Sequence, residues 1–166
     1  MIEELKREKN GHQVVLTAAT VDDSLLIARL LELYVYDFTE YMDFDVDEQG
    51  LFHYPFEAYF SEPDHFIYVA RVDNKIAGFV LLHTCQDEQN VTRYTIGEFF
   101  VLKKYRNQGV GQLMADMIFS LYPGLWLIYQ SKKNMPAQAF WRKAINAWTQ
   151  GNYREYYKDE KPQNLY

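Results

Sequence analysis

A helix that opens on two glycines constrains this chain most strongly. Residues 101–113 run from an apolar segment, through a basic turn, into a segment of helical periodicity that begins at Gly109 and Gly111. Glycines at a helix start leave backbone N–H groups uncovered, where orphan donors and the positive end of the helix dipole coincide. Arg106 adds a full positive charge next to them, and two lysines precede it. The pattern predicts a strand–turn–helix unit that binds a phosphate group.

Hydrophobic periodicity predicts alternating strands and helices along the chain. The expected elements are a strand at 13–19, a helix whose apolar face runs from Leu26 to Tyr41, a segment at 51–60 whose helical assignment stays open, strands at 66–72, 75–84 and 92–102, a helix at 109–121, a strand at 125–130, a helix at 136–145 and a strand at 153–158. Asp73-Asn74 separates two of these strands and predicts a tight antiparallel turn. The order predicts a single-domain mixed α/β fold, with a mostly antiparallel sheet flanked by helices.

Length and composition narrow the class of protein. The 166 residues fit one domain, 1–166, with a core at about 13–158. The 48% hydrophobic and 17% aromatic content excludes a disordered chain, and the net charge of −6 argues against nucleic-acid binding. Cys85 is the only cysteine, the first ten residues are mostly polar or charged, and no apolar run reaches the roughly 18 residues of a membrane span. We therefore expect a soluble cytoplasmic protein with no membrane partner.

Two segments of the chain resemble the motifs of one enzyme family. Residues Arg106–Gly111 resemble the Arg-x-x-Gly-x-Gly pyrophosphate loop of the GNAT superfamily of N-acetyltransferases, which holds the diphosphate of acetyl-coenzyme A. Residues Asn134–Trp141 resemble the family's second motif, an Asn at a strand end followed by a helix whose small residues face the pantetheine. The order of elements also matches over nearly the whole chain. Without that context, two glycines at a helix start and an Asn helix cap are both common in the absence of a ligand. The resemblance implies a GNAT-like acyl-CoA N-acyltransferase fold.

The resemblance also assigns residues to the coenzyme. In the family, the strand before the loop splays from the next strand, and the pantetheine arm bonds to exposed backbone, which here is 99–101. For the side chains of Phe99 and Val101 the alternative is an ordinary central strand, since core packing needs no ligand. The residues expected to bind coenzyme A are Phe99, Phe100, Val101, Arg106, Asn107, Gln108, Gly109, Val110, Gly111, Gln112, Asn134, Ala137, Phe140 and Trp141.

Trp141 departs from the family pattern. Many members carry a Tyr at this position, which protonates the departing coenzyme A thiolate. An indole N–H donates hydrogen bonds but has no proton to give near neutral pH. Tyr129, close by in sequence, is the substitute acid we consider, and water or an unprotonated thiolate is the alternative.

Glu98 is the leading candidate for a general base. It lies in the strand before the glycine loop, and the strand pleat predicts that Glu98 shares one face with Ile96 and Phe100. Burial among apolar side chains would raise the pKa of the Glu98 carboxyl toward the range useful for taking a proton from an ammonium. A satisfied structural carboxylate is the alternative.

Asp37 and Tyr34 are the candidates for an acceptor pocket. Both share the helical face of Leu30 and Tyr41, and the resemblance places the acceptor pocket in this first helical region. Asp37 would then face a cationic acceptor, and the acids between residues 40 and 48 would concentrate amines near it. A paired or solvated carboxylate at the edge of the apolar face is the alternative.

The sequence lacks the residue patterns that a metal site, a serine nucleophile or a nucleotide triphosphatase would require. His12, His53, His65 and His83 have no metal-ligand spacing, so we expect no metal, and the chain has neither a Gly-x-Ser-x-Gly elbow nor the Gly-Lys-Ser/Thr of a triphosphatase. The expected function is direct transfer of an acetyl group from acetyl-CoA, as co-substrate, to a primary amine of a small molecule or peptide, with a homodimer left open. Trp141 motivates the alternative, a non-catalytic module of the same fold that binds or senses acyl-CoA.

Overall fold

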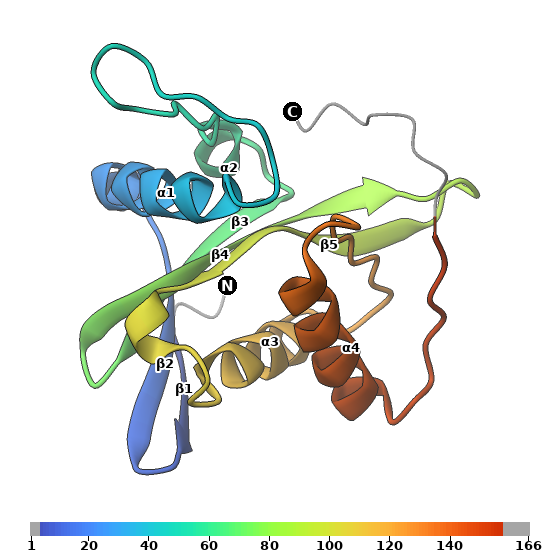
Figure 1. Ribbon diagram of the computed structural model, residues 1–166. Helices are drawn as coiled ribbons and strands as arrows, with labels where there is room; N and C mark the ends of the chain where they lie inside the picture. The colour runs from blue at the N-terminus through green and yellow to red at the C-terminus, as the bar shows by residue number, and fades with distance from the viewer. Residues whose placement is uncertain (1–3, 158–166) are drawn as a thin grey trace.

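The computed structural model describes residues 4–157 and shows one sheet with helices on both faces (Figure 1). The sheet has five strands in the order β1-β2-β3-β4-β5, and all neighbouring strands are antiparallel. The strands are β1 Glu4–Lys9, β2 His12–Ala18, β3 His65–Val72, β4 Lys75–Gln86 and β5 Thr92–Val101. The helices are α1 Ser24–Phe38, α2 Ala58–Ser61, α3 Val110–Leu121 and α4 Met135–Thr149, with 3₁₀ turns η1 Val21–Asp23 and η2 Lys103–Tyr105. The predicted mixed α/β fold with a mostly antiparallel sheet is confirmed.

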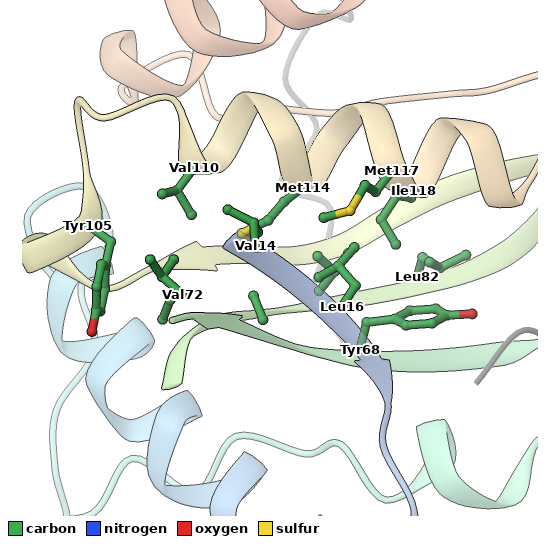
Figure 2. Close-up of a cluster of buried hydrophobic side chains, with 13 residues drawn as sticks. Val14, Leu16, Tyr68, Val72, Leu82, Tyr105, Val110, Met114, Met117 and Ile118 are labelled. Carbon is green, nitrogen blue, oxygen red and sulfur yellow. The ribbon is translucent and has the colours of Figure 1, made fainter. Parts of the chain in front are cut away.

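Each face of the sheet buries its own apolar cluster, because side chains alternate along the strands. On one face, covered by α1 and α2, Ile27 of α1 and Phe79 of β4 belong to one buried cluster. α3 and α4 cover the other face (Figure 1). There, Figure 2 shows Met114 and Ile118 of α3 directed toward Leu16 of β2. The sheet is therefore the middle of three layers.

The turns at one end of the sheet use residues in the left-handed region. Asp73 and Asn74, at φ values of 48° and 64°, connect β3 to β4 as the sequence predicts. Asn10 and Gly11, at 54° and 78°, connect β1 to β2 in the same way. Positive φ at both central residues suits the right-handed twist of antiparallel strands. A hydrogen bond between His12 and Asp73, 2.8 Å long, joins the two turns.

β1 has no counterpart among the predicted strands. Five of its six residues are exposed, and only Leu5 packs against the core. The strand therefore shows no hydrophobic alternation that a sequence pattern could detect. Its backbone pairs with β2 from Glu4 to Lys9, and charged side chains are a usual feature of edge strands.

The predicted strands at 125–130 and 153–158 are wrong for the described residues. Trp126 forms a single parallel bridge with Tyr94 of β5. Within residues 4–157, backbone hydrogen bonds join segment 125–130 to β5 only at Tyr94, so no ladder develops. Residues 152–157 are exposed and form no strand, and Lys158 lies outside the described residues. An aromatic alternation produces a strand only where a sheet edge is there to pair with it.

The helix left open within 51–60 is present only at its end, as the short α2, and the chain at 51–57 forms no helix. α4 continues to Thr149 instead of ending at residue 145. End shifts of a few residues are usual because helix termini carry weak periodic signals. Among the described residues, no helix is long and apolar enough to cross a membrane.

Candidate active site

A bulge in β5 determines which way the candidate base points. The successive residues Leu81 and Leu82 of β4 pair with Glu98 and Ile96 of β5, so Gly97 is an extra residue in the ladder. An extra residue exchanges the two faces of the strand that follows it. Ile96 accordingly packs under α3 and α4, whereas Phe100 packs under α1. The prediction that Ile96 shares a face with Glu98 and Phe100 is therefore wrong, while Glu98 and Phe100 do share one.

Glu98 is a buried carboxylate with two phenol donors. Glu98 is 9% exposed. The Tyr34 hydroxyl of α1 donates to Oε2 of Glu98, and the Tyr54 hydroxyl donates to Oε1 at 2.5 Å. Burial raises the pKa of the Glu98 carboxyl, and the two hydroxyls offset part of that rise. Burial and the nearby carboxylate also raise the pKa values of Tyr34 and Tyr54, so both phenols stay protonated as donors. The arrangement leaves a buried carboxyl whose pKa lies above its usual value.

A second carboxylate holds the loop that carries Tyr54. Glu32 of α1 accepts hydrogen bonds from the backbone N–H groups of Phe52 (2.7 Å) and His53 (3.1 Å). His53 has a φ of 54°, and its Nε2 lies 2.5 Å from Oδ2 of Asp47 within the same loop. These contacts fix the backbone directly before Tyr54. Glu32 thereby helps to position Tyr54, whose hydroxyl donates to Glu98.

A phenol–imidazole pair lies beside the bulge. Tyr59 Oη of α2 and His83 Nδ1 of β4 are 2.9 Å apart. A Cβ atom at Gly97 would lie 2.1 Å from Tyr59 Oη, so any side chain at the bulge would displace the Tyr59 hydroxyl. Burial, followed by the neighbouring His65, lowers the pKa of His83, which favours its neutral ring. A neutral imidazole can exchange one hydrogen bond with the phenol in either direction.

The basic turn after β5 is joined to α1 by an ion-pair network. Arg106 donates from Nε to the carbonyl oxygen of Val101 (2.7 Å) and from Nη2 to Asp37 (2.5 Å). Lys103 Nζ lies 3.1 Å from the other oxygen of Asp37. Burial alone would raise the pKa of Asp37, but the hydrogen bonds from Arg106 and Lys103 outweigh it and lower that pKa. The structure thus pairs Asp37 with Arg106. The sequence alone suggests that Arg106 binds coenzyme A and that Asp37 faces the acceptor amine.

The start of α3 has the geometry that the glycine pattern predicts. Gly109 precedes the helix with a φ of 81°, in the left-handed region that glycine adopts without strain. The N–H of Leu113 bonds to the carbonyl of Gly109 at 3.1 Å, so the N–H groups of residues 110–112 lie ahead of this bond. A Cβ at Gly111 would lie 3.2 Å from the Phe140 ring, which shows how closely α3 and α4 pack. The first turn of α3 therefore presents free backbone donors.

The outer edge of β5 separates from segment 125–130 beyond Tyr94. On the side of α4, Asn134 caps the helix by accepting from the Ala137 N–H at 3.0 Å. Phe140 of α4 lies over Phe99 of β5, with ring centroids 5.5 Å apart. Of the predicted coenzyme residues, Phe99 of β5, Gly111 of α3 and Phe140 and Trp141 of α4 therefore lie together on one face of the sheet. Phe100 and Arg106 do not, since the Phe100 side chain lies under α1 and the Arg106 guanidinium lies over its ring, 5.6 Å from the centroid.

Trp141 packs in the core between α4 and the sheet. It is 6% exposed, and its ring lies 5.0 Å from Phe99 and 6.5 Å from Phe119, measured between centroids. Tyr129, by contrast, is 52% exposed. The role of Tyr129 as an acid stays a prediction.

Sequence reasoning missed Tyr54 and Glu32. Tyr54 lies 44 residues before Glu98 in the chain, and no local pattern links the two. An acidic residue on the first helix and an aromatic in the next segment are ordinary features of a sequence of this composition. Only the folded backbone brings them to Glu98.

A sequence model of the acetyltransferase (GNAT) family matches residues 27–146. The structure is similar to that of an acetyltransferase from Vibrio fischeri, with 26% identity and a TM-score of 0.52 over 69% of this chain and 92% of that one. It is also similar to a predicted acetyltransferase with acetyl-CoA from Clostridium acetobutylicum (14% identity, TM-score 0.64, 92% and 97% covered). A third similar structure is an aminoglycoside acetyltransferase from an uncultured soil metagenomic sample (17% identity, TM-score 0.61, 89% and 97% covered). No relative among curated proteins matches.

Proposed function

The chain belongs to the acetyltransferase (GNAT) family and is an acyltransferase enzyme, and from this premise we propose that it transfers the acetyl group of acetyl-CoA directly to a primary amine of a small molecule or peptide. The observation that carries the proposal is the buried carboxylate of Glu98. Tyr34 and Tyr54 hold it in the strand that leads into the glycine loop.

Glu98 supplies the base that such a transfer needs. An amine attacks a thioester only in its neutral form, and a carboxyl group with a raised pKa is suited to accept the proton. In the proposed reaction Glu98 takes a proton from the amine nitrogen, the N–C bond forms and the C–S bond breaks. Coenzyme A leaves as a thiolate, which takes its proton from Tyr129 or from water. Holding amine and thioester in contact supplies much of the rate.

The arrangement around α3 supports a coenzyme A site. The free N–H groups of residues 110–112 suit a diphosphate, and the unpaired edge of β5 suits an amide chain. Gly109 and Gly111 allow a ligand to approach the backbone closely. The fit rests on backbone donors more than on Arg106, whose guanidinium already contacts Asp37 and Val101.

The amine is proposed to approach from the side of α1, next to Tyr34. Asp37 on the same helix already holds an ammonium, that of Lys103, whose side chain is 73% exposed. An exposed lysine is readily displaced, so an amine acceptor could take its place at Asp37. One structure similar to this protein is an aminoglycoside acetyltransferase, which makes amine-rich sugars a sensible first set of acceptors.

Release of free thiol tests the proposal. Wild-type protein and acetyl-CoA are incubated with a panel of polyamines, amino sugars and short peptides, and mass spectrometry identifies any acetylated amine. Glu98→Gln should lower the rate by about 100-fold, the usual scale for a general base. Glu8→Gln, which changes an exposed acid on β1, is the matched control and should keep the wild-type rate.

A non-catalytic acyl-CoA module is the alternative, motivated by Trp141 at the usual tyrosine position. Binding of acetyl-CoA without thiol release for any amine would support that module and refute the proposed enzymatic activity.

We also propose that residues 1–166 form one domain that works in the reducing cytoplasm. Cys85 fits this location as a free thiol whose pKa is raised by burial.

A further inference from the structure

A pocket of about 200 Å³ lies at the end of the sheet, beside the glycine loop. Its lining includes His12 of β2, Lys75 of β4, Lys104 of η2 and Gln108 of the loop. Gln108 donates from Nε2 to the carbonyl oxygen of Lys104 at 2.7 Å, which ties the loop to η2. The pocket therefore adjoins the segment proposed to hold the pyrophosphate of coenzyme A.

Lys9 brings a further positive charge to the loop. It lies across from His12 in the β1–β2 ladder, on the face of β2 that carries the buried Val14 under α3. Its side chain passes over Gly109, because a Cβ at Gly109 would lie 3.1 Å from Lys9 Cε and 3.3 Å from Nζ. The ammonium of Lys9 therefore lies at the start of α3.

The cations around this loop divide into two groups. Lys103 and Arg106 share the single carboxylate of Asp37. Lys9, Lys75 and Lys104, in contrast, form no ion pair with a carboxylate of residues 4–157.

Asp73 also lines the pocket, and its pKa is lowered chiefly by its hydrogen bond to His12 and to a smaller extent by the charge of Lys75. Asp73 is held by His12 (2.8 Å) and by the Gln13 N–H (3.1 Å). A chain of net charge −6 thus places three lysines that have no ion pair within residues 4–157 around one loop and one pocket. Like charges that converge in this way favour an anionic ligand.

We infer that this pocket binds the 3′-phosphate of coenzyme A through Lys75 and Lys104, and that Lys9 contacts the pyrophosphate at Gly109. The inference rests on the proposed use of acetyl-CoA. A phosphate monoester carries nearly two negative charges at neutral pH, which matches two ammonium groups facing one pocket. Arg106 then serves to join β5 to α1, and the charge that holds the coenzyme comes from the three lysines.

Calorimetry with coenzyme A and with 3′-dephospho-coenzyme A, at one fixed salt concentration, tests the assignment. The wild type should bind coenzyme A about tenfold more tightly than the dephospho form, the scale of a charged hydrogen bond. The double variant Lys75→Gln/Lys104→Gln should lose that preference and bind the dephospho form as the wild type does. Lys9→Gln should weaken both ligands by a similar factor of about ten, because both contain the pyrophosphate.

Lys143→Gln on the exposed side of α4 is the matched control and should keep both affinities. A double variant that retains the wild-type preference overturns the assignment of the 3′-phosphate, and a Lys9→Gln variant with unchanged affinities overturns the role of Lys9. A wild-type protein that binds neither ligand refutes the proposed function itself and is thereby distinguished from both results. All three lysines are exposed, so thermal unfolding should show that the variants fold as the wild type does.

Discussion

Removing the hydroxyl of Tyr54 should raise the pKa of the Glu98 carboxyl. Tyr54 donates to Oε1 of Glu98 at 2.5 Å, and Tyr34 donates to Oε2. Both bonds stabilise the ionised form, so each lowers a pKa that burial has raised. A hydrogen bond to a charged group is worth about 1.5 to 3 kcal/mol, and 1.36 kcal/mol corresponds to one pKa unit. Tyr54→Phe should therefore raise the pKa of Glu98 by about one to two units.

The assay is the pH profile of kcat/KM for thiol release from acetyl-CoA at a saturating amine concentration. The acid limb of the profile should move to higher pH, because less Glu98 is ionised at each pH below its new pKa. At a given pH on that limb, the rate should fall about tenfold if the pKa of Glu98 rises by one, while above both pKa values the two proteins differ little. The phenylalanine ring keeps the packing, so the unfolding temperature serves as a check on the fold.

Tyr36→Phe is the control for this experiment. Tyr36 also lies on α1, but it is 66% exposed and faces away from the site. Its variant should reproduce the wild-type profile. An acid limb that stays in place in Tyr54→Phe, with the amplitude of the profile unchanged, would refute the view that Glu98 is the base and that Tyr54 sets its pKa.

Three further substitutions test the site. Gly97→Ala places a Cβ 2.1 Å from Tyr59 Oη and should lower the free energy of unfolding, measured by chemical denaturation, by about 1 to 3 kcal/mol. The double variant Gly97→Ala/Tyr59→Phe lacks the clashing hydroxyl and should recover part of this loss. Equal losses in the two variants would contradict the clash. Trp141→Phe should lower stability, as expected for a ring that is 6% exposed, yet keep most turnover, and a large fall in kcat alone would give Trp141 a chemical role. Asp37→Asn should raise the KM for the acceptor about tenfold and leave the affinity for coenzyme A unchanged. A loss of stability with unchanged kinetics would limit the role of Asp37 to its ion pair with Arg106.

Local patterns in the sequence predicted those elements whose cause is local. The glycines at 109 and 111 predicted the start of α3, since an uncovered helix terminus depends on residues next to each other in the chain. Asp73 and Asn74 predicted the β3–β4 turn for the same reason, because both adopt positive φ within the turn itself. The resemblance to the GNAT superfamily, based on these motifs and on the order of elements, is confirmed by the match over residues 27–146.

Patterns failed where pairing partners decide the structure. β1 is charged and exposed, and it is a strand because β2 offers an edge. Segment 125–130 is apolar, but it meets β5 only at Tyr94. Strand formation depends on backbone groups that lie far away in the chain, so an alternating pattern alone does not decide it.

Neighbouring residues in the chain were sufficient to predict a glycine-opened helix after a strand, the candidate base Glu98 and the order of elements of an acetyltransferase. The tertiary structure decided which way Glu98 points, through the bulge at Gly97, and which phenols hold it. It also decided that Arg106 pairs with Asp37, across 69 residues of chain, and that Lys9 reaches the loop instead. The physical reason is that helix starts and turns follow from neighbouring residues, whereas hydrogen bonds and ion pairs between distant side chains exist only after the sheet has brought them together.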